Sequence, residues 1–148
     1  MKLGDLLNGK DLKYRTVVTV LPNETISAAV QKLVEHDRGA LPVCSGSGEM
    51  VGIVTERDIV RKCFGRSGNC GRIKVQDVMS KNIVIGKPED DLDYAMNVMK
   101  QERIRHLPIV DNKKVIGMIS MRDLLGVKLD ESKTEARYLS DYISGGYI

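Results

Sequence analysis

Several residue types and patterns that characterise large classes of protein are scarce in this sequence. Its 148 residues include no tryptophan and one phenylalanine, so the aromatic pattern of RNA-binding modules is missing. The net charge of +3 is too small to favour nucleic acid as a partner. No apolar run approaches the ~18 residues that a membrane-spanning helix requires. The sequence therefore argues against nucleic-acid binding and against membrane insertion.

Cysteines and targeting signals are also sparse. Cys44, Cys63 and Cys70 are odd in number and show no CxxC spacing, which favours neither a disulfide framework nor a zinc site. Residues 1–5 (MKLGD) do not begin the long apolar core of a signal peptide. We therefore expect a cytoplasmic protein.

One short motif is present twice. Residues 52–58 (GIVTERD) and 117–123 (GMISMRD) each contain a glycine, two apolar residues, a hydroxyl residue and, three positions later, an aspartate. Other identical pairs are spaced by 66 positions: Pro22 and Pro88, Ala29 and Ala95, Leu41 and Leu107, and Pro42 and Pro108. An internal repeat of this length predicts two similar structural units. Because a unit of about 60 residues buries too little surface to be stable alone, the two units should pack together.

Both copies predict the same succession of elements. Runs of β-branched residues predict strands, and apolar residues three and four positions apart predict helices. The expected strands are 17–20, 41–43 and 50–54 in the first copy and 83–85, 107–110 and 114–119 in the second; the expected helices are about 26–34, 55–63, 92–99 and 120–125, with short leader helices at 3–7 and 75–79. The fold class is therefore α+β, with two β-α-β-β-α repeats.

The chain divides into three parts. Residues 1–68 contain the first repeat with its leader, 69–129 the second repeat, and 130–148 a C-terminal helix and tail. The glycine-rich residues 65–71 form a linker, because no strand precedes them and no Gly-Lys-Ser/Thr ends them, as a phosphate-binding loop requires. The apolar face of the tail helix suits docking on its own domain or on a second subunit equally well.

The combined motifs resemble the CBS-domain family in its tandem arrangement, the Bateman module. The matching segments are the leaders ending at 5–7 and 77–79, the strand openers 38–43 (RGALPV) and 104–111 (IRHLPIVD), the two motifs above, and the tail 142–147, which is similar to that of stand-alone two-repeat members. The resemblance implies two repeats packed about a pseudo-twofold axis and a disc-like homodimer. It also implies up to two clefts for AMP, ATP, NAD(H) or S-adenosylmethionine, with no required cofactor.

The repeated motif has the chemistry to hold a nucleotide. One carboxylate, Asp58 or Asp123, can accept hydrogen bonds from both ribose hydroxyls. Thr55 and Ser120 lie where a strand becomes a helix, and the unpaired N–H groups there favour phosphate. The alternative is a capping box, in which the hydroxyl and the carboxylate satisfy backbone N–H groups of the helix. The two interpretations compete for the carboxylate.

The resemblance completes each corner with the first strand of the other repeat. It pairs Thr55 and Asp58 with Asn82, Ile83 and Val84, pairs Ser120 and Asp123 with Thr16 and Val18, and places adenine beside Ile53 or Met118.

Basic residues are distributed unequally between the repeats. Arg103, Arg105 and His106 precede the second Leu-Pro, whereas only Arg38 lies near the first. We expect Arg105 and His106 to bind phosphate; surface charge and a structural histidine are the alternatives. Arg57 and Arg122 recur, either as phosphate ligands or in a salt bridge on the helix. The sequence does not decide which ribose site the basic cluster serves.

The leading hypothesis is a regulatory module that senses energy or redox state through an adenine nucleotide and controls an unidentified partner protein. The alternative is a ligand-free dimeric scaffold. An enzyme is disfavoured, because no nucleophile–base pair or metal-ligand cluster is evident and His36 and His106 occupy non-matching positions.

Overall fold

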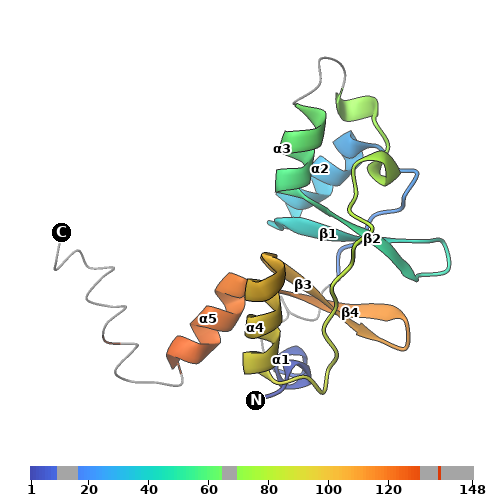
Figure 1. Ribbon diagram of the computed structural model, residues 1–148. Coiled ribbons are helices and arrows are strands. Elements are labelled where there is room, and N and C mark those ends of the chain that lie inside the picture. The colour runs from blue at the N-terminus through green and yellow to red at the C-terminus, as the bar shows by residue number, and fades with distance from the viewer. Residues whose placement is uncertain (10–16, 65–69, 131–136, 138–148) are drawn as a thin grey trace, which may run out of the picture.

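The computed structural model describes residues 1–9, 17–64, 70–130 and 137 (Figure 1). Two antiparallel hairpins, each accompanied by helices, lie one above the other in Figure 1. In chain order the elements are α1 (Leu3–Leu7), α2 (Ile26–Glu35), β1 (Ala40–Cys44), β2 (Met50–Thr55), α3 (Glu56–Cys63), the 3-10 helices η2 (Cys70–Arg72) and η3 (Val75–Asp77), α4 (Leu92–Glu102), β3 (His106–Asp111), β4 (Lys114–Ser120) and α5 (Met121–Asp130). The α+β class and the internal repeat are confirmed.

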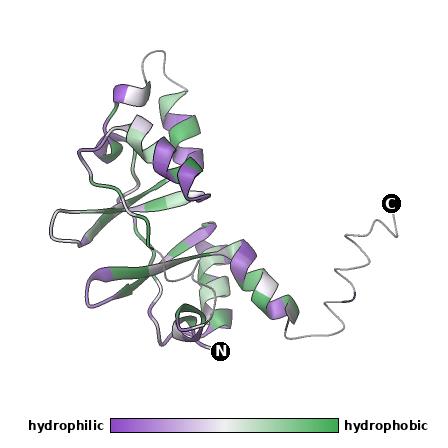
Figure 2. Cartoon of the chain, turned by 180° about the vertical axis from the view of Figure 1, so that it is seen from behind, coloured by the Kyte–Doolittle hydropathy of each residue, from purple (hydrophilic) through white to green (hydrophobic). Residues whose placement is uncertain are grey.

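The two hairpins have matching registers. Leu41 pairs with Val54 in the first and Leu107 with Ile119 in the second, and all four side chains are buried. Each hairpin has one register irregularity, at equivalent positions in β1 and β3. Figure 2 shows that the strands are largely hydrophobic, whereas much of the helical surface is hydrophilic. The pairing thus places one apolar face of each hairpin against its helices.

The prediction of strands at 17–20 and 83–85 is wrong. The first is reduced to one parallel bridge, between Val20 and Val43, and no residue of the second pairs; the equivalent bridge joins Ile109 to Gly86, one residue beyond the expected range. The bridges are closed by the Val20 N–H donating to the Pro42 carbonyl at 3.1 Å and by the equivalent Gly86 bond at 2.8 Å. The next ladder bond would require an N–H from that proline, which has none. The Leu-Pro of each repeat therefore ends the pairing.

Each short leader precedes one repeat in the sequence but packs against the core of the other repeat. Leu3, Leu6 and Leu7 of α1 are buried in the core of the second repeat, and Val75 and Val78 are buried in the core of the first. The backbone repeats this exchange: Gly4 N–H donates to the Pro88 carbonyl at 2.8 Å, and Gln76 N–H donates to the Pro22 carbonyl at 2.9 Å. The two repeats are therefore joined by their leaders.

The last described helix is longer than expected. α5 continues past Leu125 to Asp130 because Leu124 is buried in the second core and Val127 packs against it. The tail helix expected from residue 130 onward lies outside the described residues, apart from Asp130 and Arg137. None of the helices in the described part of the chain is both long and apolar enough to cross a membrane.

Candidate functional site

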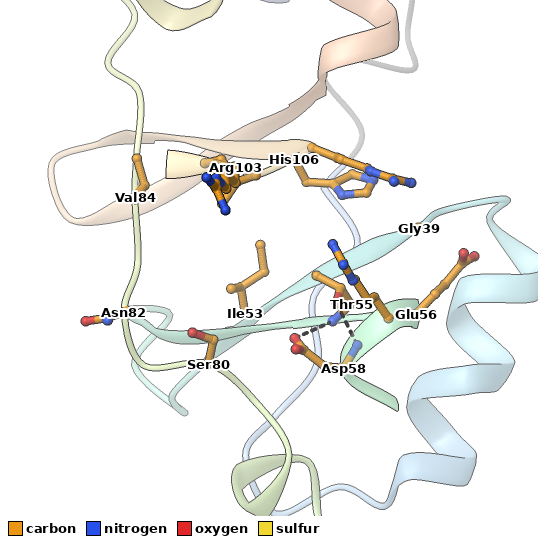
Figure 3. Close-up of a pocket in the computed structure, with 13 residues that line it drawn as sticks. Gly39, Ile53, Thr55, Glu56, Asp58, Ser80, Asn82, Val84, Arg103 and His106 are labelled. Atoms are coloured by element: carbon orange, nitrogen blue, oxygen red, sulfur yellow. Dashed lines mark hydrogen bonds between the residues drawn. The ribbon is translucent and has the colours of Figure 1, made fainter. Parts of the chain in front are cut away.

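A cleft of about 270 Å³ lies between the two repeats. Its walls come from the end of β2 with the start of α3, from the segment that follows η3, and from the approach to β3 (Figure 3). The lining residues are Gly39, Ile53, Thr55, Glu56, Arg57, Asp58, Ser80, Asn82, Val84, Arg103, Ile104, Arg105 and His106. A ligand in this cleft would touch both repeats at once.

The corner between β2 and α3 is a capping box. The Thr55 hydroxyl accepts from the Asp58 N–H at 3.0 Å, and Oδ2 of Asp58 accepts from the Thr55 N–H at 3.3 Å (Figure 3). Ser120 and Asp123 make the same two bonds at 3.0 Å. The capping interpretation is therefore confirmed in both repeats. In the first repeat the carboxylate of Asp58 uses Oδ2 for its capping bond, so its other oxygen has lone pairs that can accept from a ribose hydroxyl.

The segment after η3 is fixed against β2 by two backbone bonds. Ile53 and Ser80 exchange N–H···O bonds at 3.0 and 2.8 Å. From Ser80 onward, alternate residues of this segment, Asn82 and Val84, line the cleft, and Ile83 does not. This is the expected result for an extended chain, in which successive side chains point to opposite faces.

The basic residues of the second repeat face the corner of the first. In Figure 3, Arg103 and His106 lie across the cleft from Ile53, Thr55 and Asp58. The structure thus assigns the basic cluster to the Thr55–Asp58 cleft, a choice that the sequence left open. Positive charge contributed by one repeat thus lies across the cleft from the carboxylate of the other.

His106 is the most enclosed member of this cluster. Its ring lies against Gly39, where an added Cβ would be 2.9 Å from Nε2. Burial lowers the pKa of His106, Arg105 acts in the same direction, and Glu56 and Asp123 oppose the shift. The imidazole therefore favours its neutral form unless an anion enters the cleft.

Other residues expected at a site lie elsewhere. Ser120, Asp123, Met118 and Arg122 belong to the corner of the second repeat and do not line this cleft. Arg38 is half-buried just before β1 and is also outside the lining. Thr16 lies outside the described residues, and Val18 packs against the first core. The composition of a second cleft therefore stays a prediction.

Four lining residues were not expected from the sequence: Gly39, Glu56, Ser80 and Ile104. Ser80 could have been found, since an extended segment that presents Asn82 and Val84 also presents the residue two positions earlier. Glu56 and Ile104 carry no such signal beyond adjacency to predicted residues. Gly39 enters through a long-range contact with His106. In the described residues no group of three His, Cys, Asp or Glu side chains is placed to hold a metal ion.

The sequence profile of the CBS domain matches the chain twice, at residues 10–65 and 75–130. The chain belongs to the CBS-domain family. This CBS pair is 38% identical over 115 residues to the CBS domain-containing protein YhcV of Bacillus subtilis, covering 78% of the chain and 81% of YhcV. It is 34% identical over 129 residues to the mitochondrial CBS domain-containing protein CBSX3 of Arabidopsis thaliana, covering 84% of the chain. The match spans only 63% of the length of CBSX3.

Solved structures agree with this assignment. A protein with CBS domains from Burkholderia ambifaria superposes with a TM-score of 0.83 at 32% identity, covering 90% of this chain and 97% of that one. The CBS domain pair of protein MJ0100, crystallised with 5′-methylthioadenosine and S-adenosylmethionine, gives a TM-score of 0.77 at 20% identity, covering 89% and 98%. Because the sequence identity to MJ0100 is low, the second comparison shows similarity of fold only. Both confirm the α+β CBS pair.

Proposed function

We propose that this CBS pair is a regulatory module that binds an adenine nucleotide in the cleft between its repeats. One observation carries the proposal: the Thr55–Asp58 corner of one repeat and the Arg103–His106 segment of the other line a single cavity of about 270 Å³. A carboxylate on one wall and cations on the other match a ligand with a ribose at one end and a phosphate at the other.

Each part of the ligand has a partner of suitable chemistry. Asp58 accepts hydrogen bonds from the ribose hydroxyls through the oxygen that does not cap α3. The half-buried side chains of Ile53, Val84 and Ile104 provide an apolar surface for the base. Arg103 and Arg105 approach the phosphate, and guanidinium groups suit it because of their planar pairs of donors.

The fold accommodates such ligands elsewhere. The CBS pair of protein MJ0100 holds two adenosine derivatives in its crystal structure. That likeness supports an adenosyl ligand here without naming one, so AMP, ATP, NAD(H) and S-adenosylmethionine are all candidates.

We propose that ligand binding is signalled by a change in the relative placement of the two repeats. The cleft is lined by both repeats, and the exchanged leaders already connect the two cores. A ligand that bridges the walls favours one relative placement of the repeats, and a partner protein that distinguishes placements responds. We assign no catalytic step to the module. We propose that it acts as a homodimer in the cytoplasm.

Thermal unfolding in the presence of AMP, ATP, NADH or S-adenosylmethionine tests the proposal. A ligand that binds only the folded protein stabilises it by about 2.7 kcal/mol at one hundred times Kd. We expect at least one of the four to raise the midpoint. No shift with any of them at millimolar concentration would contradict nucleotide binding.

Two matched variants locate the site. Asp58→Ala and Asp123→Ala remove equivalent capping bonds, so both should lose about 1 kcal/mol of stability. Only Asp58 lines the cleft, and only Asp58→Ala should weaken binding there. Equal affinities in both variants and the unmodified protein would leave Asp58 as a helix cap with no role in binding.

A ligand-free dimeric scaffold remains the second candidate, because apolar side chains are exposed on the helices of the first repeat. Val34 on α2 is 75% exposed, and Val60 on α3 and Phe64 at its end are 59% and 72% exposed. Exposed apolar side chains of this kind suit contact with another protein. Light scattering with and without nucleotide separates the candidates, since the scaffold predicts a dimer and partner binding that do not depend on ligand.

A further inference from the structure

A second cavity adjoins the cleft on the far side of the arginines. This groove, of about 600 Å³, lies along α4 and the starts of α3 and α5. Arg57, Arg103, Ile104 and Arg105 line both the groove and the cleft. The two cavities therefore share one wall, which is formed mainly by arginines.

The groove is cationic. Lys100 on α4 adds a fourth basic side chain to Arg57, Arg103 and Arg105, and no aspartate or glutamate is found among the described residues that line it. Like charges gathered on one surface repel one another and attract anions. The groove thus favours a ligand with several negative charges in a row.

Three of the four cations are not required by the repeated fold, whereas Arg57 recurs as Arg122. At the equivalent positions of the first repeat, Val34 stands in place of Lys100, Asp37 in place of Arg103 and Gly39 in place of Arg105. Both copies nevertheless form the same hairpin with its helices. The charge of Lys100, Arg103 and Arg105 is therefore a property of this groove rather than of the CBS architecture.

Arg103 lies at the junction in an unfavourable backbone conformation. It ends α4 with φ 56°, in the left-handed region where glycine is the preferred residue. Asp37 has φ 51° at the equivalent position of the first repeat. The conformation is therefore common to both repeats, and the cationic side chain is what distinguishes Arg103.

We propose that the ligand of the cleft carries two or more phosphates in a chain, and that the chain crosses the arginines into the groove toward Lys100. This inference rests on the proposed nucleotide binding and narrows the ligand class to nucleoside polyphosphates. It disfavours S-adenosylmethionine, whose sulfonium is positive. The volume of the cleft supports this inference. At about 270 Å³ the cleft lies below the lower limit of small-molecule pockets, about 300 Å³, so a nucleoside polyphosphate would have to extend beyond it.

The test is calorimetric titration of adenosine, AMP, ADP and ATP in buffer with EDTA, so that no divalent cation masks the phosphates. We expect affinity to rise from adenosine through AMP to ADP and ATP. Lys100→Gln should weaken ATP binding by about two- to fivefold, the range of exposed ion pairs, and leave AMP unchanged. Lys87→Gln removes the same charge from a lysine that lines neither cavity and should have no effect.

Arg103→Gly provides a second variant that should fold well. Its φ suits glycine, so thermal stability should not fall, whereas ATP affinity should. Asp37→Gly makes the equivalent backbone change outside both cavities and should not weaken ATP binding.

The outcomes separate the two proposals. If AMP binds as tightly as ATP, or if Lys100→Gln weakens both ligands equally, the polyphosphate inference is wrong and nucleotide binding stands. If none of the four probes binds, both fail.

Discussion

The ring of His106, at the start of β3 in the second repeat, lies against Gly39 of the first, and a Cβ on Gly39 would be 2.9 Å from Nε2. The two residues come from segments that precede equivalent Leu-Pro pairs. The contact therefore joins the repeats at the wall of the cleft and sets the position of the imidazole.

Gly39→Ala should displace His106. We expect a loss of about 1 kcal/mol in the free energy of unfolding, at the lower end of overpacking costs because the displaced atoms end a side chain. Urea unfolding measures this loss. Gly46→Ala is the control, since a Cβ there meets nothing within 4 Å. His106→Ala should cancel most of the cost in a double-mutant cycle; equal costs with and without His106 would show that another contact is responsible.

Stability should depend on pH through His106. Burial lowers its pKa from 6.5 in the folded state, so the unfolded chain takes up the proton first as the pH falls. The contribution of His106 to stability is therefore fully present above about pH 6.5 and is lost as the pH falls toward the folded pKa. Urea unfolding at pH 7.5 and 5.5 should show a larger loss for the unmodified protein than for His106→Gln. An equal loss in both would assign the pH dependence to other groups.

The exchanged leaders should contribute strongly to stability. Leu3 is completely buried in the core of the second repeat, more than 80 positions away in sequence from its partners there. Leu3→Ala should cost about 2–5 kcal/mol, as for other buried leucines, whereas the exposed Leu21→Ala should cost far less. Thermal unfolding compares the two. Similar midpoints for both variants would contradict the exchange.

Local features of this structure could be predicted from the sequence, and long-range ones could not. The Thr55–Asp58 and Ser120–Asp123 capping boxes depend on residues three positions apart, so the motif alone indicated them. The prediction of strands at 17–20 and 83–85 was wrong, because their pairing would require an N–H from a proline in a different segment, and proline has none.

The composition of the cleft shows the same division. Its carboxylate corner was predicted from one short motif. The exchange of leaders and the assignment of Arg103 and His106 to the first corner depend on how two similar repeats pack. A repeated sequence cannot distinguish a segment that packs on its own repeat from one that packs on the other.

A crystal structure of the protein soaked with ATP tests the central claim most directly. We expect the ribose hydroxyls within hydrogen-bonding distance of Asp58, the base beside Ile53 and the phosphates beside Arg103 and Arg105, between the two repeats. An empty cleft at saturating ATP, or a nucleotide bound only at the Ser120–Asp123 corner, would contradict the account.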